Sequence, residues 1–222
     1  MGSLFPTTMD INADGASDVG LNVWIRPPVS PYDHIYHFLN GLTQNTIWTL
    51  VSFPFSRGGY PVFTDIEKDG IPEAIISHDW GCIGRLFLRD ARNGAPRWSK
   101  ELGFCALGTP VPADINSDGN KEILVDVEPY INAYFGSIVA LNGLNGSENW
   151  RKDSVPVTGD VVIGNLDGGA DLETITYGYG IFAFKANGLS LWSYTQAQAN
   201  ATFLPFFPTP GPTVYILNVS IA

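Results

Sequence analysis

The sequence is poor in basic residues. Lys and Arg together number 12 against 22 Asp and Glu, and charged residues of all kinds make up only 15% of the 222 residues. The formal net charge is −10. A field of this sign repels nucleic-acid phosphates and anionic membrane surfaces, and it attracts cations. We therefore expect no nucleic-acid partner.

Long hydrophobic runs and helical periodicity are also missing. No stretch of about 18 apolar residues occurs, which predicts that the chain does not insert into a membrane. The opening residues 1–6 have neither the basic nor the apolar part of a secretory signal. No segment repeats apolar residues at the spacing of three and four that is typical of a helix. Since hydrophobic residues still make up 45% of the chain, a packed all-β protein is expected.

Cysteine is scarce, with Cys82 and Cys105 as the two examples. They could pair in an oxidising compartment or remain free thiols in a reducing one, and the sequence leaves both options open. No Cys-x-x-Cys motif occurs, and the three histidines are too scattered to form a zinc site by spacing.

What the sequence does contain is an internal repeat. A nine-residue acidic segment occurs at 10–18, 65–73, 114–122 and 165–173, with starts 55, 49 and 51 residues apart. A second marker, an Asn-Gly turn followed by Trp, keeps step with it and ends at Trp48, Trp98, Trp150 and Trp192. Two markers in a fixed order indicate four tandem units of about fifty residues.

Each unit predicts about four antiparallel strands. A short strand enters the acidic segment, a β-branched run such as 123–125 follows it, and the Asn-Gly turn favours a tight hairpin before the Trp-bearing strand. A unit of this size matches one blade of a β-propeller. We place the units at about 5–55, 56–105, 106–156 and 157–199, with 200–222 as a partial fifth, all in one domain spanning 1–222.

The acidic segments concentrate charge. They hold 13 of the 22 acids in the chain. Like charges 4 Å apart repel by roughly 4 kcal/mol at an intermediate effective dielectric, so this crowding calls for a counterion. Oxygen ligands at alternating positions with a Gly at the bend suit Ca²⁺ better than zinc or copper. Asp, Asn and Gly also make ordinary turns, but that explains one such loop better than three near-identical ones.

An EF-hand is excluded, because position twelve of its loop must be a bidentate Glu. Here that position holds Leu21, Ile76, Val125 or Thr176, and an acid comes at position nine instead. We expect side-chain oxygens from positions one, three, five and nine, and a backbone carbonyl from position seven. The expected ligands are Asp10, Asn12, Asp14, Ala16 and Asp18; Asp65, Glu67, Asp69, Ile71 and Glu73; Asp114, Asn116, Asp118, Asn120 and Glu122.

The fourth loop is incomplete, with Asn165 at position one and Gly169 at position five. Its remaining candidates are Asp167, Asp171 and Glu173. Three calcium sites are expected, and the fourth is left open.

These Asp-x-Asn-x-Asp-Gly loops, each followed by a strand, resemble the FG-GAP and VCBS repeats of integrin α-subunit propellers and of related bacterial and fungal surface proteins. The resemblance implies calcium-stabilised blades with the metal loop in a hairpin between neighbouring strands. The Asn-Gly and Trp marker is similar to the blade ends of quinoprotein-type propellers. Because both ends of the chain resemble the same half of a blade, we expect an incomplete propeller or one completed by another chain.

On this basis the sequence predicts a calcium-stabilised module that binds a protein or glycan ligand without catalysis, outside the cell or on its surface, where calcium is plentiful. One alternative is a structural subunit of a filament or surface assembly that associates with its own copies or belongs to a longer chain. Another is a polysaccharide lyase-like enzyme. The acid–base candidates outside the loops lie in no recognisable catalytic motif; they are the three histidines, Asp33, Asp79, Glu101, Asp126 and Glu128.

Overall fold

The computed structural model describes residues 6–25, 33–51, 59–80, 83–103, 106–128, 135–155, 161–178, 180–195 and 197–198. In these ranges the chain forms seventeen strands arranged in four antiparallel sheets. None of the described segments is a helix with the length and apolarity needed to cross a membrane. Both cysteines and the partial fifth unit predicted at 200–222 lie outside the described residues.

Four consecutive strands form each sheet, in the order of the sequence. The first contains β1 (Thr7–Met9), β2 (Asp18–Ile25), β3 (Asp33–Leu39) and β4 (Thr46–Val51). The second contains β5 (Val62–Thr64), β6 (Glu73–Trp80), β7 (Ile83–Asp90) and β8 (Pro96–Glu101). The third contains β10 (Val111–Ala113), β11 (Glu122–Glu128), β12 (Gly136–Asn142) and β13 (Glu148–Val155), with β9 (Ala106–Leu107) paired to β11. The fourth contains β14 (Val162–Gly164), β15 (Glu173–Tyr177), β16 (Gly180–Phe184) and β17 (Ser190–Thr195).

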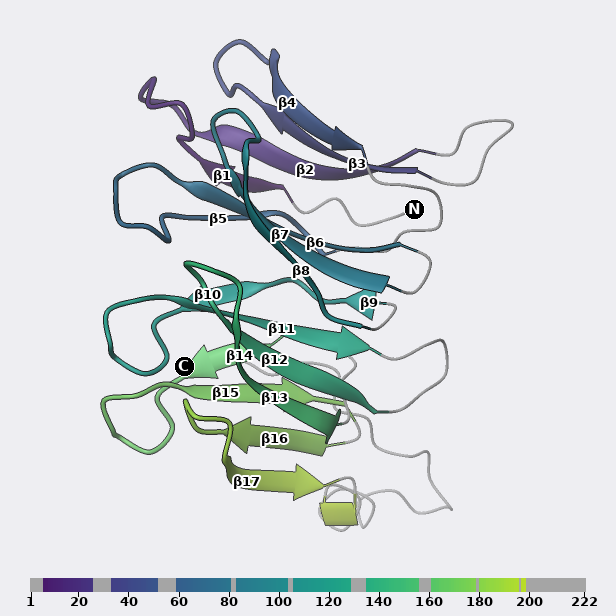
Figure 1. Cartoon of the computed structure of the whole chain (residues 1–222), viewed down its shortest axis with the longest axis vertical. Coiled ribbons are helices and arrows are strands. Elements are labelled where there is room, and N and C mark those ends of the chain that lie inside the picture. Colours follow the sequence, from purple (N-terminus) through teal and green to yellow (C-terminus); the bar gives the residue numbers. More distant parts are fainter. Residues whose placement is uncertain are drawn as a thin grey trace, which may run out of the picture.

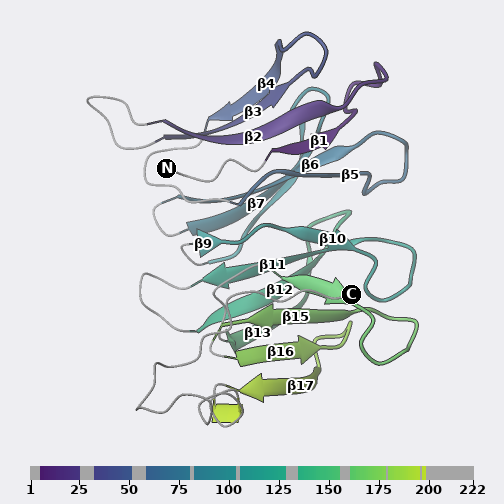
Figure 2. The same cartoon turned by 180° about the vertical axis from the view of Figure 1, so that it is seen from behind.

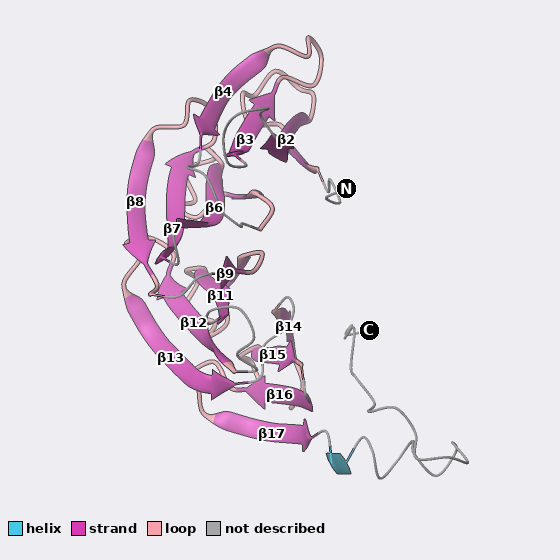
Figure 3. Cartoon of the chain, turned by 90° about the vertical axis from the view of Figure 1, so that its right-hand side faces the viewer, coloured by secondary structure: helices cyan, strands magenta, loops and turns pink. Residues whose placement is uncertain are grey.

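The four sheets follow one another along the long axis of the molecule (Figures 1 and 2). Seen from the side, they lie on an arc, with β4, β8, β13 and β17 along its outer edge and β2, β6, β11 and β14 nearer its inner edge (Figure 3). Four-stranded meanders set face to face in sequence order confirm the all-β, blade-like units that the repeat predicts.

The hydrophobic core lies between neighbouring sheets. One cluster joins Ile75 and Leu88 of the second sheet to Ile123 and Leu141 of the third, all fully buried. Similar clusters lie between the first and second sheets and between the third and fourth. Because each sheet buries one face against the next, the sheets are stabilised as a stack.

A tryptophan from the outer strand of each of the first three sheets reaches the next sheet. Its indole N–H donates to a backbone carbonyl at the turn between that sheet's third and fourth strands. The pairs are Trp48 Nε1 to Ala91 O (2.6 Å), Trp98 Nε1 to Gly143 O (2.8 Å) and Trp150 Nε1 to Ala186 O (2.7 Å). The Trp marker of the sequence therefore ties each sheet to its successor.

The glycine of the same turn makes room for the indole ring. Gly94 has a φ of 73°, and a Cβ added to it would lie 2.7 Å from the ring of Trp48. Gly146 stands in the same relation to Trp98, also at 2.7 Å. Glycine is needed here both for the left-handed backbone and for the close approach of the ring.

Candidate metal sites

The four acidic segments form the loops between the first and second strands of the four sheets, β1–β2, β5–β6, β10–β11 and β14–β15. All four project from the same side of the molecule (left in Figure 1). They are numbered loops 1 to 4 in chain order, and positions within them run from one to nine.

The acid at position nine begins the second strand of each sheet and is buried in every loop, with at most 2% of its surface exposed. One of its oxygens accepts a hydrogen bond from the backbone N–H at position two, which closes the loop. The pairs are Asp18 with Ile11 (3.1 Å), Glu73 with Ile66 (2.8 Å), Glu122 with Ile115 (3.1 Å) and Glu173 with Leu166 (2.7 Å).

The carboxylates at positions one and five are held by backbone donors in loops 1 to 3. Position one accepts from the N–H of the glycine at position six: Asp10 from Gly15 (2.9 Å), Asp65 from Gly70 (3.0 Å) and Asp114 from Gly119 (2.9 Å). Position five accepts from the N–H of position seven: Asp14 from Ala16 (3.0 Å), Asp69 from Ile71 (2.8 Å) and Asp118 from Asn120 (2.7 Å). The three loops thus share one arrangement of expected ligands.

Loops 1 to 3 also share an unfavourable backbone conformation. Position four is left-handed although it is not glycine, with φ values of 60° at Ala13, 58° at Lys68 and 56° at Ser117. Such a residue costs on the order of 1 kcal/mol. The same cost at the same place in three loops indicates a backbone held in one shape by the groups that converge inside it.

Burial disfavours the charged form of the position-nine acids of loops 2 and 3. Burial raises the pKa of Glu73, and the neighbouring carboxylates of Glu67 and Asp69 raise it further. Burial likewise raises the pKa of Glu122, with Asp118 and Asp114 adding to the effect. A nearby cation would relieve this stress in both loops.

Two oxygens in these loops are buried without any hydrogen-bond partner, Oε1 of Glu73 in loop 2 and Oδ1 of Asp114 in loop 3. A buried carboxylate oxygen without a partner loses its hydration and gains nothing in exchange. Hard oxygen donors of this kind are the ligands that Ca²⁺ takes. The donor sets of loops 2 and 3 therefore fit a calcium ion.

Loop 1 is more fully satisfied by protein donors. The second oxygen of Asp18 accepts from the N–H of Gly41 (2.9 Å), and Asn40 donates to Asp14 (2.7 Å). This amide is the main reason that the pKa of Asp14 is lowered. The oxygens retain free lone pairs, so the loop 1 donor set also fits calcium.

The third position differs among the loops in a way that balances charge. Loops 1 and 3 have an amide there, Asn12 and Asn116. Loops 2 and 4 have an acid, and in both a basic side chain lies near it: Arg97 is 3.7 Å from Glu67, and Lys185 is 3.7 Å from Asp167. In the described ranges no three Asp, Glu, His or Cys side chains are close enough to hold a metal by themselves. The expected ligand sets combine carboxylates with amide and backbone oxygens.

Loop 4 is closed by its own hydrogen bonds. Asn165 donates to the carbonyl of Gly169 (2.6 Å) and accepts from the N–H of Gly168 (2.7 Å). Its left-handed residue is Gly168, and Asp171 stands at position seven, where the other loops are expected to offer a backbone carbonyl and no side chain. With no side chain at position five, the residues of loop 4 do not fit the ion that the other three loops fit.

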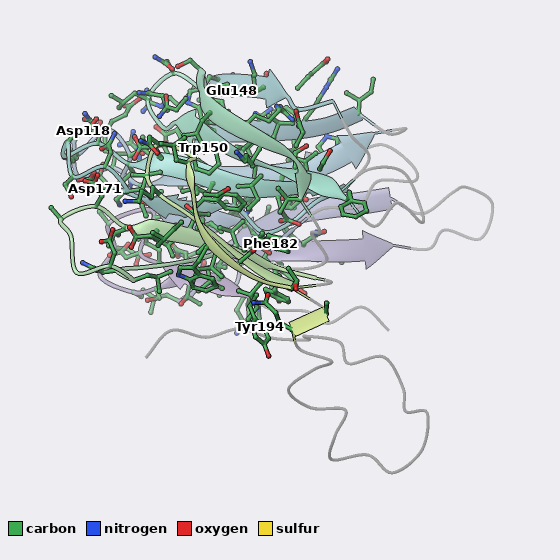
Figure 4. The ribbon with its side chains drawn as sticks, turned by 90° about the horizontal axis from the view of Figure 1, so that it is seen from below. Asp118, Glu148, Trp150, Asp171, Phe182 and Tyr194 are labelled. Carbon is green, nitrogen blue, oxygen red and sulfur yellow. The ribbon has the colours of Figure 1, made fainter. Side chains whose placement is uncertain are left out.

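A polar groove of about 680 Å³ separates loops 3 and 4. Its lining includes Asp118 and Asp171, which Figure 4 shows at the same end of the molecule, together with Trp150 and Lys185.

The residue at position two links the loops to the core, which reasoning from the sequence missed. Ile11, Ile66 and Ile115 are 1–2% exposed, and each belongs to a cluster between neighbouring sheets. The signal was present, because every loop has Ile or Leu at this position between two expected ligands. In loops 1 to 3 the residue between the first two expected ligands thus anchors the loop in the core.

The acid–base candidates outside the loops are spread over four strands, β3, β6, β8 and β11. His78, on β6, is buried and stacks on Phe87 at a ring distance of 5.3 Å. Asp126, on β11, is also buried, whereas Glu101, on β8, is exposed and forms an ion pair with Arg85.

No protein-family model and no curated protein matches the chain, so the resemblance to FG-GAP and VCBS repeats stays a prediction. Solved structures do match. The rhamnogalacturonan lyase YesW aligns with a TM-score of 0.61 and 14% identity over 85% of this chain and 41% of its own. A rhamnogalacturonan lyase from Bacillus licheniformis has the same score and identity over 86% and 41%. A quinohemoprotein alcohol dehydrogenase from Pseudomonas putida HK5 has a TM-score of 0.56 and 12% identity over 80% and 33%.

The chain forms an arc of β-propeller blades. It spans about 40% of the length of the two lyases. The expectation of a binding or adhesion module is wrong on this comparison, because the solved structures described above are rhamnogalacturonan lyases and a dehydrogenase. The expected absence of catalysis stays a prediction. At 14% identity or less these structures share the fold with this chain, and neither a filament subunit nor a lyase activity follows from a shared fold.

Proposed function

We propose that this propeller arc binds calcium, with one ion in each of loops 1, 2 and 3 and none in loop 4, and that the ions stabilise the stack of blades. The observation that carries the proposal is the pair of buried oxygens without partners, on Glu73 and Asp114, inside loops that already crowd three or four carboxylates. A divalent cation supplies the missing partner and offsets the repulsion.

In loops 1 to 3 the side chains at positions one, three, five and nine and the carbonyl at position seven would hold the ion. The bound ion supplies positive charge at the place where the chain has gathered negative charge. The residues of the chain determine the shape of the site: the backbone donors hold positions one and five, and the acid at position nine closes the loop onto position two.

Metal binding in a loop and packing between blades are coupled through position two. Ile66 lies between the expected ligands Asp65 and Glu67, and its side chain is buried in the core shared by the second and third blades. An ion that fixes the ligands therefore also fixes this side chain in the core. Calcium binding is expected to stabilise contacts between blades as well as the loop itself.

Calcium sites in loops of this type generally work where the ion is abundant, so the proposal favours a location outside the cell or on its surface. Sites that bind at millimolar concentration would be empty in a cytosol and full outside.

Calcium titration by isothermal calorimetry, with equilibrium dialysis for stoichiometry, tests the proposal. We expect about three ions per chain and a melting temperature that falls when a chelator removes them. Asp69→Asn should remove one ion, because Asp69 is the acid at position five of loop 2. Asp171→Asn in loop 4 is the matched control and should leave the stoichiometry unchanged. A melting temperature that is the same in millimolar calcium and in chelator would refute the proposal.

A further inference from the structure

The fourth blade presents a tryptophan without the partner that the other three have. Trp192 occupies the place of Trp48, Trp98 and Trp150, four residues after its own turn glycine, but it is 43% exposed. The described part of the chain provides no acceptor for its indole N–H, whereas the other three donate to the next blade at 2.6–2.8 Å.

A second residue of the same face shows the same pattern. At position two of the acidic loops, Ile11, Ile66 and Ile115 are 1–2% exposed because the next blade covers them. Leu166, at this position in the fourth loop, is only partly buried. Two side chains from separate parts of the blade, whose counterparts pack on the successor blade elsewhere, thus mark one face that the described part of the chain leaves partly exposed.

The first blade differs from the others at the turn between its third and fourth strands. This is the turn on which the tryptophan of a preceding blade rests in the second, third and fourth blades. The turn of the first blade places Gln44 where the other turns have Gly94, Gly146 and Gly188. The match is structural, since Gln44 N donates to Asn40 O at 2.8 Å as Gly94 N donates to Asp90 O at 2.9 Å. Gln44 also shares the left-handed backbone, with a φ of 61°.

Gln44 in place of glycine blocks the docking of an indole ring on this turn. A Cβ at Gly94, Gly146 or Gly188 would lie 2.7–2.9 Å from the tryptophan that rests on it. Gln44 has such a Cβ and a longer side chain beyond it. A tryptophan that approached the first blade in the geometry of the other three would collide with it.

We propose that the face of the fourth blade around Trp192 and Leu166 is a docking surface for a further blade of this repeat type with a left-handed glycine at its turn, and that Gln44 keeps the first blade of any copy of this chain off that surface. The three internal precedents identify the occupant. In each of them the accepting carbonyl belongs to the blade that follows in sequence, 43, 45 and 36 residues after the tryptophan.

The test supplies the missing turn on a second molecule. The receiver is the full chain carrying Gln44→Gly and Trp192→Ala, which offers a glycine turn and cannot dock onto itself. The donor is the unaltered chain with Trp192. Sedimentation velocity and calorimetry on the mixture should show a one-to-one complex that neither component forms alone.

Two controls separate the roles of the residues. A receiver that keeps Gln44 and carries Trp192→Ala alone should bind the donor at least about tenfold more weakly, since an aromatic anchor in a fitted pocket is worth a factor of this size or more. A Trp192→Ala donor should lose binding to the glycine receiver to the same extent. Both substituted positions are largely exposed, so unchanged circular dichroism and melting curves should show that the fold is retained.

Each other outcome overturns the proposal. Equal binding by the receivers with and without the Gln44→Gly substitution would show that Gln44 is no barrier. Equal binding by the two donors would show that Trp192 is not the docking group. No complex at millimolar concentration would show that this face does not accept a glycine-turn blade, and self-association of the unaltered chain through Trp192 would make a second copy the occupant.

Discussion

Replacing Glu73 by Gln should stabilise the metal-free protein and weaken its response to calcium. Glu73 is fully buried, one oxygen is held by the N–H of Ile66, and the other has no partner. The amide keeps the first hydrogen bond through its own oxygen. It also removes a buried charge that burial and the carboxylates of Glu67 and Asp69 disfavour.

The size of the effect follows from the unpartnered oxygen. An unsatisfied buried group costs about 1–3 kcal/mol, and more when it is charged. The amide nitrogen of the variant still lacks a partner but carries no charge, so we expect Glu73→Gln to raise the metal-free free energy of unfolding by about 1 kcal/mol. In calcium the order should reverse. An ion at one hundred times its dissociation constant contributes about 2.7 kcal/mol, and the variant should lose the part that belongs to loop 2.

The dependence on pH gives a second readout of the same change. The folded-state pKa of Glu73 is raised above its ordinary value of 4.5, so the folded protein holds its proton more tightly than the unfolded chain does. Metal-free stability should therefore fall as the pH rises from about 4.5 through the raised pKa, since the folded state must then accept a buried charge. Glu73→Gln should flatten this fall.

Urea unfolding at 25 °C and neutral pH, in chelator and in millimolar calcium, measures both effects. The control is Glu148→Gln, which changes an exposed acid paired with Arg151 and should shift stability by well under 1 kcal/mol in either buffer. A metal-free Glu73→Gln protein that is less stable than the unaltered chain would refute the reasoning. It would mean that the second oxygen has a favourable partner within the protein.

Three further predictions concern the stack of blades. Ile115→Ala should lower the free energy of unfolding by about 2–4 kcal/mol in urea titration, because Ile115 is 1% exposed in the core between the third and fourth blades. Leu42→Ala, the control at a site that is 66% exposed, should change the free energy of unfolding by less than about 0.5 kcal/mol. Trp98→Phe should cost on the order of 1 kcal/mol by the same measurement through the lost indole hydrogen bond, and Trp192→Phe should cost close to nothing since its N–H has no acceptor in the described part of the chain. Hydrogen bonds from Arg92 lower the pKa of Asp90 below its ordinary value of 3.8. The stability that the charged Asp90 provides is therefore present above pH 3.8 and is lost as the pH falls through the lowered pKa. In an acid titration, the Asp90→Asn variant should lack this loss of stability.

The blade repeat could be read from the sequence because its signals are local. The Asn-Gly turns, the β-branched runs and the acidic loops each specify a hairpin from a few adjacent residues, and the strands form where these signals place them. The ligand pattern of loops 1 to 3 was equally local. The hydrogen bonds that close these loops join residues seven apart, such as Ile66 and Glu73.

The contacts between blades could not be read in this way. The partner of Trp98 is the carbonyl of Gly143, 45 residues away, and no short-range pattern identifies it. The role of Gln44 as a departure from glycine becomes visible only when the four turns are aligned in space by their left-handed backbone and, in the first three, by a shared hydrogen bond. The fourth loop shows the same limit, since Asn165 preserves a ligand type but uses both of its side-chain groups within the loop.

The hydrogen bonds of the loops explain why oxygen-bearing side chains occur there, and the proposed ions explain why several of these side chains are charged. Asp65 accepts from the N–H of Gly70, and a neutral Asn could accept the same bond, so turn formation alone requires an oxygen but no charge. What turn formation leaves unexplained is a buried acid at position nine whose pKa is raised and whose second oxygen lacks a partner, as at Glu73. A neutral side chain would serve the hairpin better at this position. The charge at this position in loops 2 and 3, where burial raises the pKa of Glu73 and Glu122, is therefore best accounted for by a cation whose coordination the other positions of these loops can complete.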